Sequence, residues 1–250
     1  MSDYFLLSVQ QLDRIFPYLP LARGLPRSDD RLVISGIIYV LKGGLRWRDA
    51  PSFYGPHKTL YNRFNRWSRR GVFERIFAAL TALEKEAETI AMDSTHIKAH
   101  RTAASLPTKR GERHIGRTKG GLNSKLHVIC NKEAKPLVLM LTKGNVSDYK
   151  GAAFMLNVLP KAKYLLADRG YDANWLREAL AKKDITPVIP CRKNRKVQIP
   201  YDTTAYKKRH VIENVFAKLK DWRKIATRYE RCAHTAFSAI VIAAIVIWWM

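Results

Sequence analysis

The sequence is poor in cysteine, and the few cysteines it has are badly placed for cross-linking or for binding zinc. Cys130, Cys191 and Cys232 are the three that occur in 250 residues, and no CxxC pair is among them. This odd number and wide spacing exclude a disulfide framework and a zinc-finger type of site. We therefore expect a protein of the reducing cytoplasm.

Three other features are missing, and each excludes a class of protein. The N-terminal segment MSDYFLLSVQQLDRIF has no basic region before its apolar residues, so it does not resemble a signal peptide. The apolar run at residues 236–250 falls short of the about 20 residues that a membrane span needs and predicts a buried terminal helix. No GxxxxGK[ST] loop is present, so no nucleotide cofactor is expected.

Acidic residues are scarce relative to basic ones, and this imbalance points to a polyanionic partner. Lysine and arginine total 45 against 21 aspartate and glutamate residues, which gives a formal net charge of +24. A surface this basic repels itself unless it meets a polyanion, and nucleic acid is the usual one. A basic but merely solvated surface, or a ribosome-associated protein, is the alternative. The length suits one catalytic domain with a small accessory domain.

Residues 1–88 predict a small helical domain that binds DNA. Amphipathic segments at 9–16 and 29–43 are followed by a Gly-Gly stop, a turn and the helical sequence KTLYNRFNRWSRR. This order of helix, glycine break and Arg-rich helix is typical of a helix-turn-helix. The candidate DNA contacts are Arg63, Arg66, Arg69 and Arg70. The alternative is a helical bundle whose arginines are only solvated.

Residues 89–250 predict an α/β catalytic domain. Strand-like hairpin segments come first and alternating helices and strands follow, which favours a mixed sheet flanked by helices. Residues 98–125 are rich in Lys, Arg and Gly and predict a basic loop that becomes ordered on DNA. Its candidate DNA contacts are Arg113, Arg117 and Lys119. A passive, solvated insertion is the alternative.

Two aspartates follow apolar, strand-like runs. Asp93 closes the run Ile90–Met92, and Asp168 closes Tyr164–Ala167. Ligands gather at the carboxyl ends of strands in open α/β sheets, so we expect both carboxylates in one cleft. Carboxylates at such a position need a cation, and carboxylate oxygens are the ligands that Mg²⁺ prefers. Plain turn-forming aspartates are the alternative.

A third acidic residue stands in the segment YKKRHVIENVFAKLK, which predicts one long helix over 205–223. Tyr206, Arg209, Glu213 and Lys220 fall within one polar stripe of that helix. Beside it runs an apolar stripe that would pack on the sheet, made of Ile212, Val215, Phe216 and Leu219. By spacing alone, an ordinary amphipathic helix with i,i+4 ion pairs is an equally good interpretation.

The stripe has the form Y-x2-R-x3-E-x6-K and resembles the signature of DDE transposases of bacterial insertion sequences. The segments MDSTHIKAH around Asp93 and ADRGYD around Asp168 are similar to the other two blocks of that group. RWRDAP, YNRFNRW and KIATRYER resemble the fifth insertion-sequence family, written here as the IS-five family. The resemblance covers nearly the whole chain, in several independent blocks that occur in the right order.

The resemblance implies a ribonuclease-H-like catalytic fold with Asp93, Asp168 and Glu213 as catalytic metal ligands for two Mg²⁺ ions, with Mn²⁺ as a substitute. It implies hydrolysis of a DNA strand at the element's end, followed by attack of the freed 3′-hydroxyl on target DNA. Arg209 and Lys220 would hold phosphates, and Tyr206 would contact phosphate or a displaced base. The expected partners are element ends, target DNA and further copies of the chain, at the bacterial nucleoid and not at a membrane.

Two other functions are compatible with the same residues. A metal-dependent nuclease or recombinase of this fold would cut nucleic acid without strand transfer, and it needs the same three carboxylates. A catalytically inactive protein would bind DNA only through its N-terminal helices. Asp172, four residues after Asp168, is interpreted either as an acid that supports the site or as a helix cap.

Overall fold

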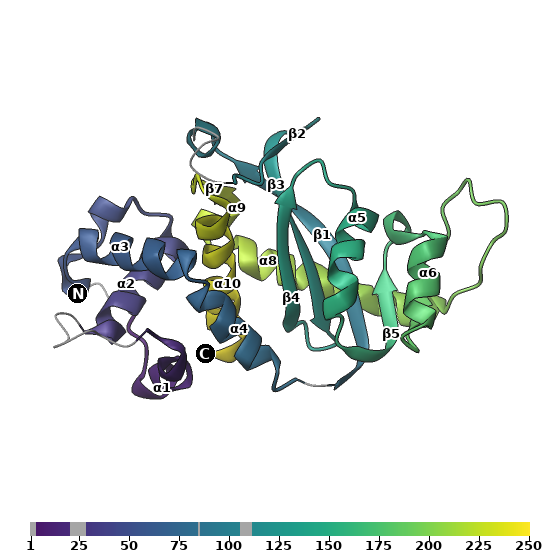
Figure 1. Ribbon diagram of the computed structural model, residues 1–250, viewed down its shortest axis with the longest axis horizontal. Helices are drawn as coiled ribbons and strands as arrows, with labels where there is room; N and C mark the ends of the chain where they lie inside the picture. Colours follow the sequence, from purple (N-terminus) through teal and green to yellow (C-terminus); the bar gives the residue numbers. More distant parts are fainter. Residues whose placement is uncertain (1–3, 21–28, 85, 106–111) are drawn as a thin grey trace. The chain divides into compact units, whose positions relative to one another are not determined.

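The computed structural model describes residues 4–20, 29–84, 86–105 and 112–250, and its chain divides into two compact units (Figure 1). The helical unit consists of Met1–Leu80, His100–Glu112 and Leu219–Met250. The sheet unit consists of Thr81–Ala99 and Arg113–Lys218. The C-terminal segment therefore groups with the N-terminal helices. The functional division into a DNA-binding domain at 1–88 and a catalytic domain at 89–250 stays a prediction.

Local sequence explains where the first helices of the helical unit begin and end. Ser8 and Gln11 form a reciprocal capping box at the start of α1 (Val9–Ile15). Asp29 caps α2 (Asp30–Gly43) by accepting from the amide of Arg31. Gly44 then ends α2 in a left-handed conformation at φ 73°, where a side chain would be strained.

The Arg-rich helix is confirmed as α3 (His57–Arg69), and after Gly71 the chain continues as α4 (Val72–Thr81). Leu60, Phe64 and Trp67 of α3 are buried, so the apolar face of this helix forms part of the core. Among its described residues this unit also contains the short elements η1 (Phe16–Tyr18), η2 (Trp47–Asp49), η3 (Ser52–Tyr54), η4 (Arg101–Ser105), α9 (Arg223–Ala226) and β7 (Thr227–Arg228).

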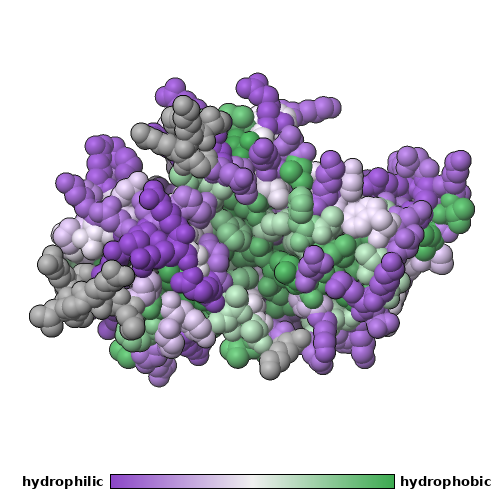
Figure 2. All heavy atoms as spheres, viewed as in Figure 1, coloured by the Kyte–Doolittle hydropathy of each residue, from purple (hydrophilic) through white to green (hydrophobic). Residues whose placement is uncertain are grey.

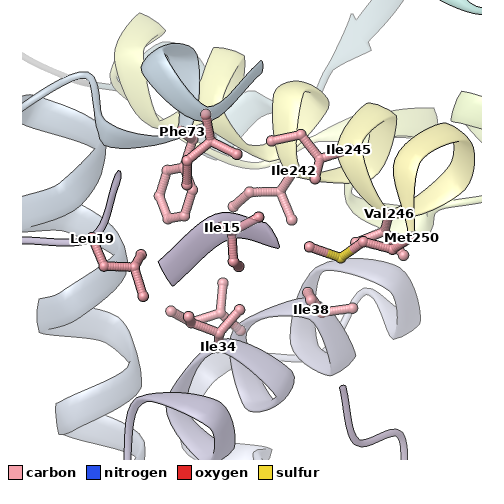
Figure 3. Close-up of a pocket in the computed structure, with 11 residues that line it drawn as sticks. Ile15, Leu19, Ile34, Ile38, Phe73, Ile242, Ile245, Val246 and Met250 are labelled. Carbon is pink, nitrogen blue, oxygen red and sulfur yellow. The ribbon is translucent and has the colours of Figure 1, made fainter. Parts of the chain in front are cut away.

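The apolar C-terminal run forms α10 (Ala233–Trp249), which packs against α2 and α3 within the helical unit. Most of its residues are buried, so the prediction of a buried terminal helix is confirmed. Figure 3 shows a small apolar pocket here, where Ile15 of α1 lies among Ile34 and Ile38 of α2 and Ile242 of α10. Among the described residues, no helix has the length and apolar character that crossing a membrane requires.

The sheet unit contains a mixed sheet with the order β2-β3-β1-β5-β6, and β4 pairs with β3. β1 is antiparallel to β3 and parallel to β5, and β5 is parallel to β6. This confirms the expected mixed sheet. The strands are β1 (Glu86–Ala99), β2 (Gly116–Thr118), β3 (Gly121–Asn131), β4 (Pro136–Lys143), β5 (Lys161–Ala167) and β6 (Thr186–Val188).

Helices flank this sheet. In Figure 1, α5 (Asp148–Met155) and α6 (Asn174–Ala181) lie in front of the strands and α8 (Val211–Lys220) runs behind them. An apolar core forms between the sheet, α5 and α6, and it includes Ile90, Met155 and Leu176. The remaining short elements are η6 (Leu156–Val158), η7 (Arg169–Tyr171), α7 (Thr203–Lys207) and η8 (Lys208–His210).

Three local predictions are wrong. β1 does not end at Asp93 but continues to Ala99, because β3 goes on pairing with it after the parallel partner β5 has ended. The predicted long helix over 205–223 is interrupted by the 3-10 turn η8. The predicted basic loop 98–125 is in large part strand and short helix, since β1, η4, β2 and β3 all contribute to it; its residues 106–111 lie outside the described residues.

Candidate active site

Sheet register places Asp93 and Asp168 at equivalent positions on neighbouring strands. Met92 of β1 pairs with Ala167 of β5, and this is the last parallel pair. The next residues along the two strands are Asp93 and Asp168. The backbone register therefore places the two residues side by side on neighbouring strands, although β1 itself continues; that their carboxylates share one cleft stays a prediction.

Asp93 is a largely desolvated carboxylate. Its side chain is only 19% exposed. The amide of Ser94 donates to Oδ1 at 2.7 Å, and Arg209 Nη1 donates to Oδ2 at 2.7 Å. The pKa of Asp93 is raised to about 6, mainly because burial disfavours its charge and also because Asp168 lies nearby, and this rise outweighs the lowering effects of Ser94 and Arg209. Such a carboxylate is strongly stabilised by a cation.

Arg209 joins two of the three predicted ligands. Its Nη2 donates to Glu213 Oε1 at 2.8 Å while Nη1 is bonded to Asp93. Glu213 is 60% exposed, whereas Arg209 is 18% exposed. Tyr206 lies beside the guanidinium, whose carbon is 5.9 Å from the ring centroid. Three residues of the polar stripe therefore come together despite the 3-10 turn between them, and Glu213 is held near Asp93.

Asp168 ends β5 and shapes the turn that follows it. Its Oδ1 accepts from the amide of Gly170 at 2.8 Å, which closes the 3-10 turn η7. A side chain at Gly170 would collide with this carboxylate, because its Cβ would lie 2.8 Å from Asp168 Oδ1 and 3.4 Å from Asp148 Oδ2. The carboxylates of Asp168 and Asp148 therefore both lie close to Gly170.

Asp172 follows the 3-10 turn η7 and is held there by three arginines. The side chain is 1% exposed, and it accepts from Arg177 Nε, from Arg195 Nη1 and from the amide of Arg192. Arg192 also donates from its side chain to the carbonyl of Gly170 at 2.7 Å. Asp172 therefore anchors the loop after β6 to the turn after Asp168. It does not cap α6, whose N-cap residue is Ala173.

Asp148 is a site residue that the sequence did not reveal. Ser147 is the N-cap residue of α5, but it makes no side-chain cap bond. Asp148 Oδ1 instead accepts from Ser94 Oγ at 2.5 Å and from Lys125 Nζ at 3.0 Å. Burial raises its pKa, but these hydrogen bonds hold the pKa of Asp148 below its usual range. Only the three-dimensional pairing of β1, β3 and α5 brings these residues together.

The residues present fit a hard divalent cation by their chemistry. The predicted ligands are all carboxylates, which are the ligands that Mg²⁺ prefers, and Asp93 is already desolvated. Among the described residues, no three His, Cys, Asp or Glu side chains lie close enough to form a ready-made metal centre. Arg209 occupies the space between Asp93 and Glu213 and supplies the positive charge there.

The predicted DNA contacts differ in how available they are. Arg63 is 21% exposed, pairs with Asp30 at 2.8 Å and lies over the ring of Trp67. Arg66 and Arg69 are exposed on α3, and Arg70 is exposed at its C-cap.

The remaining predicted contacts lie elsewhere on the chain. Arg117 and Lys119 are exposed at the β2–β3 hairpin, and Arg113 is half-buried just before it. Lys220 is half-buried at the end of α8, and burial lowers its pKa. In Figure 2, hydrophilic side chains dominate the visible surface around α6 and the loop after β6.

Taken together, a mixed sheet flanked by helices and carrying carboxylates at one edge defines the ribonuclease-H-like class. In fold, the chain is similar to the piggyBac transposase in a synaptic complex with hairpin DNA, with a TM-score of 0.51 and 9% identity. That likeness covers 96% of this chain and 70% of the other.

The sequence narrows this class to one family. Residues 84–249 match the family described as "Transposase DDE domain", and residues 7–77 match the "Putative transposase of IS4/5 family". The chain therefore belongs to the DDE transposases of insertion sequences, enzymes that act on DNA.

Two curated relatives agree with this assignment. The "Putative transposase for insertion sequence element IS6501" of Brucella ovis is 35% identical over 129 residues, which are 51% of this chain and 98% of that protein. The "Putative transposase for insertion sequence element IS402" of Burkholderia cepacia is 31% identical over 146 residues, which are 50% of this chain and 67% of that protein.

Proposed function

We propose that this transposase cleaves DNA at the ends of its insertion sequence and joins the freed strand to target DNA, in a reaction that depends on a divalent metal. One observation carries the proposal. Asp93 and Asp168 lie at equivalent positions of adjacent strands, and Glu213 is tied to Asp93 through Arg209. The family chemistry requires three carboxylates grouped in this way at one edge of the sheet.

Asp93, Asp168 and Glu213 would hold the metal, with Mg²⁺ as the expected ion and Mn²⁺ as a substitute. When bound, a pair of such ions stabilises the negative charge on the attacking and leaving oxygens during an in-line displacement at phosphorus. Binding requires Arg209 to release at least one carboxylate, because both of its bonded nitrogens now contact these oxygens. A DNA phosphate is a suitable new partner for the released guanidinium.

The basic residues of the stripe would position the DNA strand. Arg209, once exchanged onto a phosphate, places positive charge beside the carboxylate site, where negative charge develops at phosphorus during displacement. Lys220 would contact a phosphate further along the strand. Tyr206, which now lies against Arg209, offers a ring for a displaced base or a hydroxyl for phosphate.

We further propose that α3 contacts the element's end through Arg66, Arg69 and Arg70. Replacing any one of these exposed residues with alanine should weaken binding to end DNA and reduce the slope of log K against log salt by about one. Fluorescence anisotropy at several salt concentrations measures this slope. Lys42→Ala, an exposed cation on α2, is the matched control and should leave the slope unchanged. Three alanine variants with the wild-type slope would contradict the assignment of α3.

The catalytic proposal is tested with labelled element-end DNA. Wild-type protein should nick the end in Mg²⁺ and join it to a second duplex, whereas Asp168→Asn and Glu213→Gln should do neither. Each substitution removes a carboxylate charge and keeps the side-chain shape. Nicking without joining would favour the nuclease interpretation. Wild-type protein that neither nicks nor joins, or variants that match it, would overturn the proposal.

The proposed function also implies particular DNA partners and an assembly of several copies of the chain. Paired element ends and a target duplex are the proposed substrates, at the nucleoid of a bacterial cytoplasm. A homo-oligomer assembled on the paired ends is the proposed active form. Light scattering of the protein with and without end DNA would measure its mass directly.

A further inference from the structure

Residues 191–199, which come shortly after β6, form a closed basic loop. Their sequence CRKNRKVQI holds four basic residues and no acidic one. The two ends of the loop meet at Cys191, whose Sγ accepts from the amide of Ile199 at 3.1 Å and donates to the carbonyl of the same residue at 3.4 Å. Within the loop, the amide of Arg195 donates to the carbonyl of Arg192 at 3.0 Å, which makes a tight turn. In Figure 1 this is the light-green loop beside α6. The loop therefore has a defined shape of its own.

The 191–199 loop is fixed to the turn that follows Asp168. Arg192 Nη2 donates to the carbonyl of Gly170, two residues after Asp168, at 2.7 Å. The carboxylate of Asp172 accepts from the amide of Arg192 and from Arg195 Nη1, each at 2.9 Å. All of these groups belong to the sheet unit. The place of the loop relative to the candidate active site is therefore set by direct hydrogen bonds.

These hydrogen bonds engage the two arginines of the loop and leave its two lysines outside. Arg195 also donates from Nη2 to Asn174 Oδ1, so the guanidinium groups of both arginines are bound within the protein. Lys193 and Lys196 are exposed, and within the described part of the chain neither amine has an ion-pair partner. An unpaired amine on a loop of fixed shape is a ready contact for an anion, because little backbone freedom is lost on binding.

A merely solvated loop is the alternative, and the buried anchor argues against it. Asp172 is 1% exposed, and burying a carboxylate is costly unless it is paired. Besides Arg177, its partners are the amide of Arg192 and Arg195 Nη1, and both belong to the loop. A buried ion pair is a weak source of stability, so its clearest effect here is to hold the loop in one arrangement.

The side chains left outside select a partner by charge and not by sequence. The planar fork of arginine gives the geometrically specific contacts to DNA bases, but both arginines of the loop are already bound. Lysine is a flexible point charge that suits phosphate oxygens, and phosphates carry no sequence information. Asn194 stands at the centre of the turn, where asparagine is favoured for its backbone preference. An element's end has to be told apart by its sequence, whereas a target duplex can be held through phosphates alone.

We propose that the 191–199 loop holds target DNA by its phosphate backbone, through Lys193 and Lys196. The inference rests on the proposed strand transfer, because a protein that only cuts DNA needs no target. Since the loop is bonded to the turn after Asp168, a backbone held by the two lysines is presented to the carboxylate site in a defined place. Such positioning lowers the entropic cost of bringing the acceptor strand to the freed 3′-hydroxyl.

Replacing both lysines with alanine in the full-length protein tests the loop through binding. The probe is a labelled duplex that contains no element end, followed by fluorescence anisotropy without divalent metal. We expect the double variant Lys193→Ala, Lys196→Ala to bind it about tenfold more weakly, with a slope of log K against log salt that is lower by about two. The matched control is the double variant Lys161→Ala, Lys163→Ala, which removes two exposed cations near the opposite end of β5 from Asp168 and should keep the wild-type slope.

Strand joining distinguishes target DNA from the element's end. In Mg²⁺ the variant Lys193→Ala, Lys196→Ala should nick labelled end DNA within about twofold of the wild-type rate, whereas joining should need about tenfold more target DNA for its half-maximal rate. Arginine at both positions keeps the charge and should restore joining.

Two results would overturn the inference and leave the proposed function intact. One is an alanine variant with the wild-type salt slope, and the other is a variant in which nicking falls as far as joining, because the loop would then hold the element's end. Wild-type protein that never joins strands would overturn the proposed strand transfer and this inference with it.

Discussion

Replacing Asp93 with asparagine should abolish DNA cleavage and at the same time make the protein more stable at pH 7. The catalytic loss should reach about 1000-fold or more, because a neutral amide cannot replace a metal-binding carboxylate. The gain in stability has the same origin as the raised pKa. Burial holds the pKa of Asp93 at about 6 in the folded protein, against about 3.9 in an unfolded chain. The ionised carboxylate therefore opposes folding at neutral pH.

The size and sign of this effect follow from linkage. Two pKa units correspond to about 3 kcal/mol, which is an upper value for the gain in unfolding free energy at pH 7. Between the two pKa values the folded state binds the proton more tightly, so wild-type stability rises as pH falls from about 6 to about 4. The difference between Asp93→Asn and wild type should therefore shrink to near zero at pH 4. Urea unfolding of both proteins at pH 7 and pH 4 measures this difference in unfolding free energy.

The difference in unfolding free energy between Asp93→Asn and wild type at each pH isolates the contribution of Asp93 from that of other titrating groups. His127, whose pKa burial lowers to about 4, and Glu74, whose pKa burial raises, are present in both proteins and cancel. Asp184→Asn, at an exposed carboxylate, should show neither the gain in stability nor the loss of cleavage. An Asp93→Asn protein that is less stable than wild type at pH 7 would mean that the Arg209 pair outweighs the cost of burial.

The sequence predicted those parts of the site that depend on local periodicity. The apolar stripe of α8 is buried, and its polar neighbours Arg209 and Glu213 are held together by an i,i+4 ion pair. The apolar runs before Asp93 and Asp168 likewise predicted two buried strands, and these strands pair in parallel up to the residues before the two aspartates, although β1 continues beyond Asp93. A 3-10 turn at η8 did not disperse the stripe, since the chain resumes helical geometry within three residues.

Other features of the site and fold could not be predicted from the sequence, because they depend on contacts between segments that lie far apart along the chain. The local sequence of Asp148 is that of a helix start, yet its carboxylate is bound by Ser94 of β1 and Lys125 of β3. The extension of β1 beyond Asp93 is imposed by β3, which lies far along the chain. The place of α10 beside α2 and α3 reflects only that apolar faces bury one another, and sequence spacing carries no sign of which faces meet.

Arg209→Met should change metal binding and catalysis in opposite directions, with tighter metal binding and slower DNA cleavage. In the structure Arg209 and a metal would compete for the same oxygens, since its guanidinium bonds to both Asp93 and Glu213. Removing the competing charge should tighten Mn²⁺ binding roughly tenfold, the order expected for losing one nearby cation at a partly buried site. Measurement at pH 8 keeps Asp93 ionised in both proteins, because its pKa is about 6.

Strand cleavage by the same variant should nevertheless fall by about 100-fold, because the positive charge that would grip the phosphate is lost. Lys208→Met, at an exposed cation of the adjoining 3-10 turn, is the matched control and should change neither quantity. Weaker Mn²⁺ binding in Arg209→Met would show that the guanidinium assembles the two carboxylates for the metal. Tighter binding with lost cleavage would identify Arg209 as a cation that holds the carboxylates together until DNA and metal replace it.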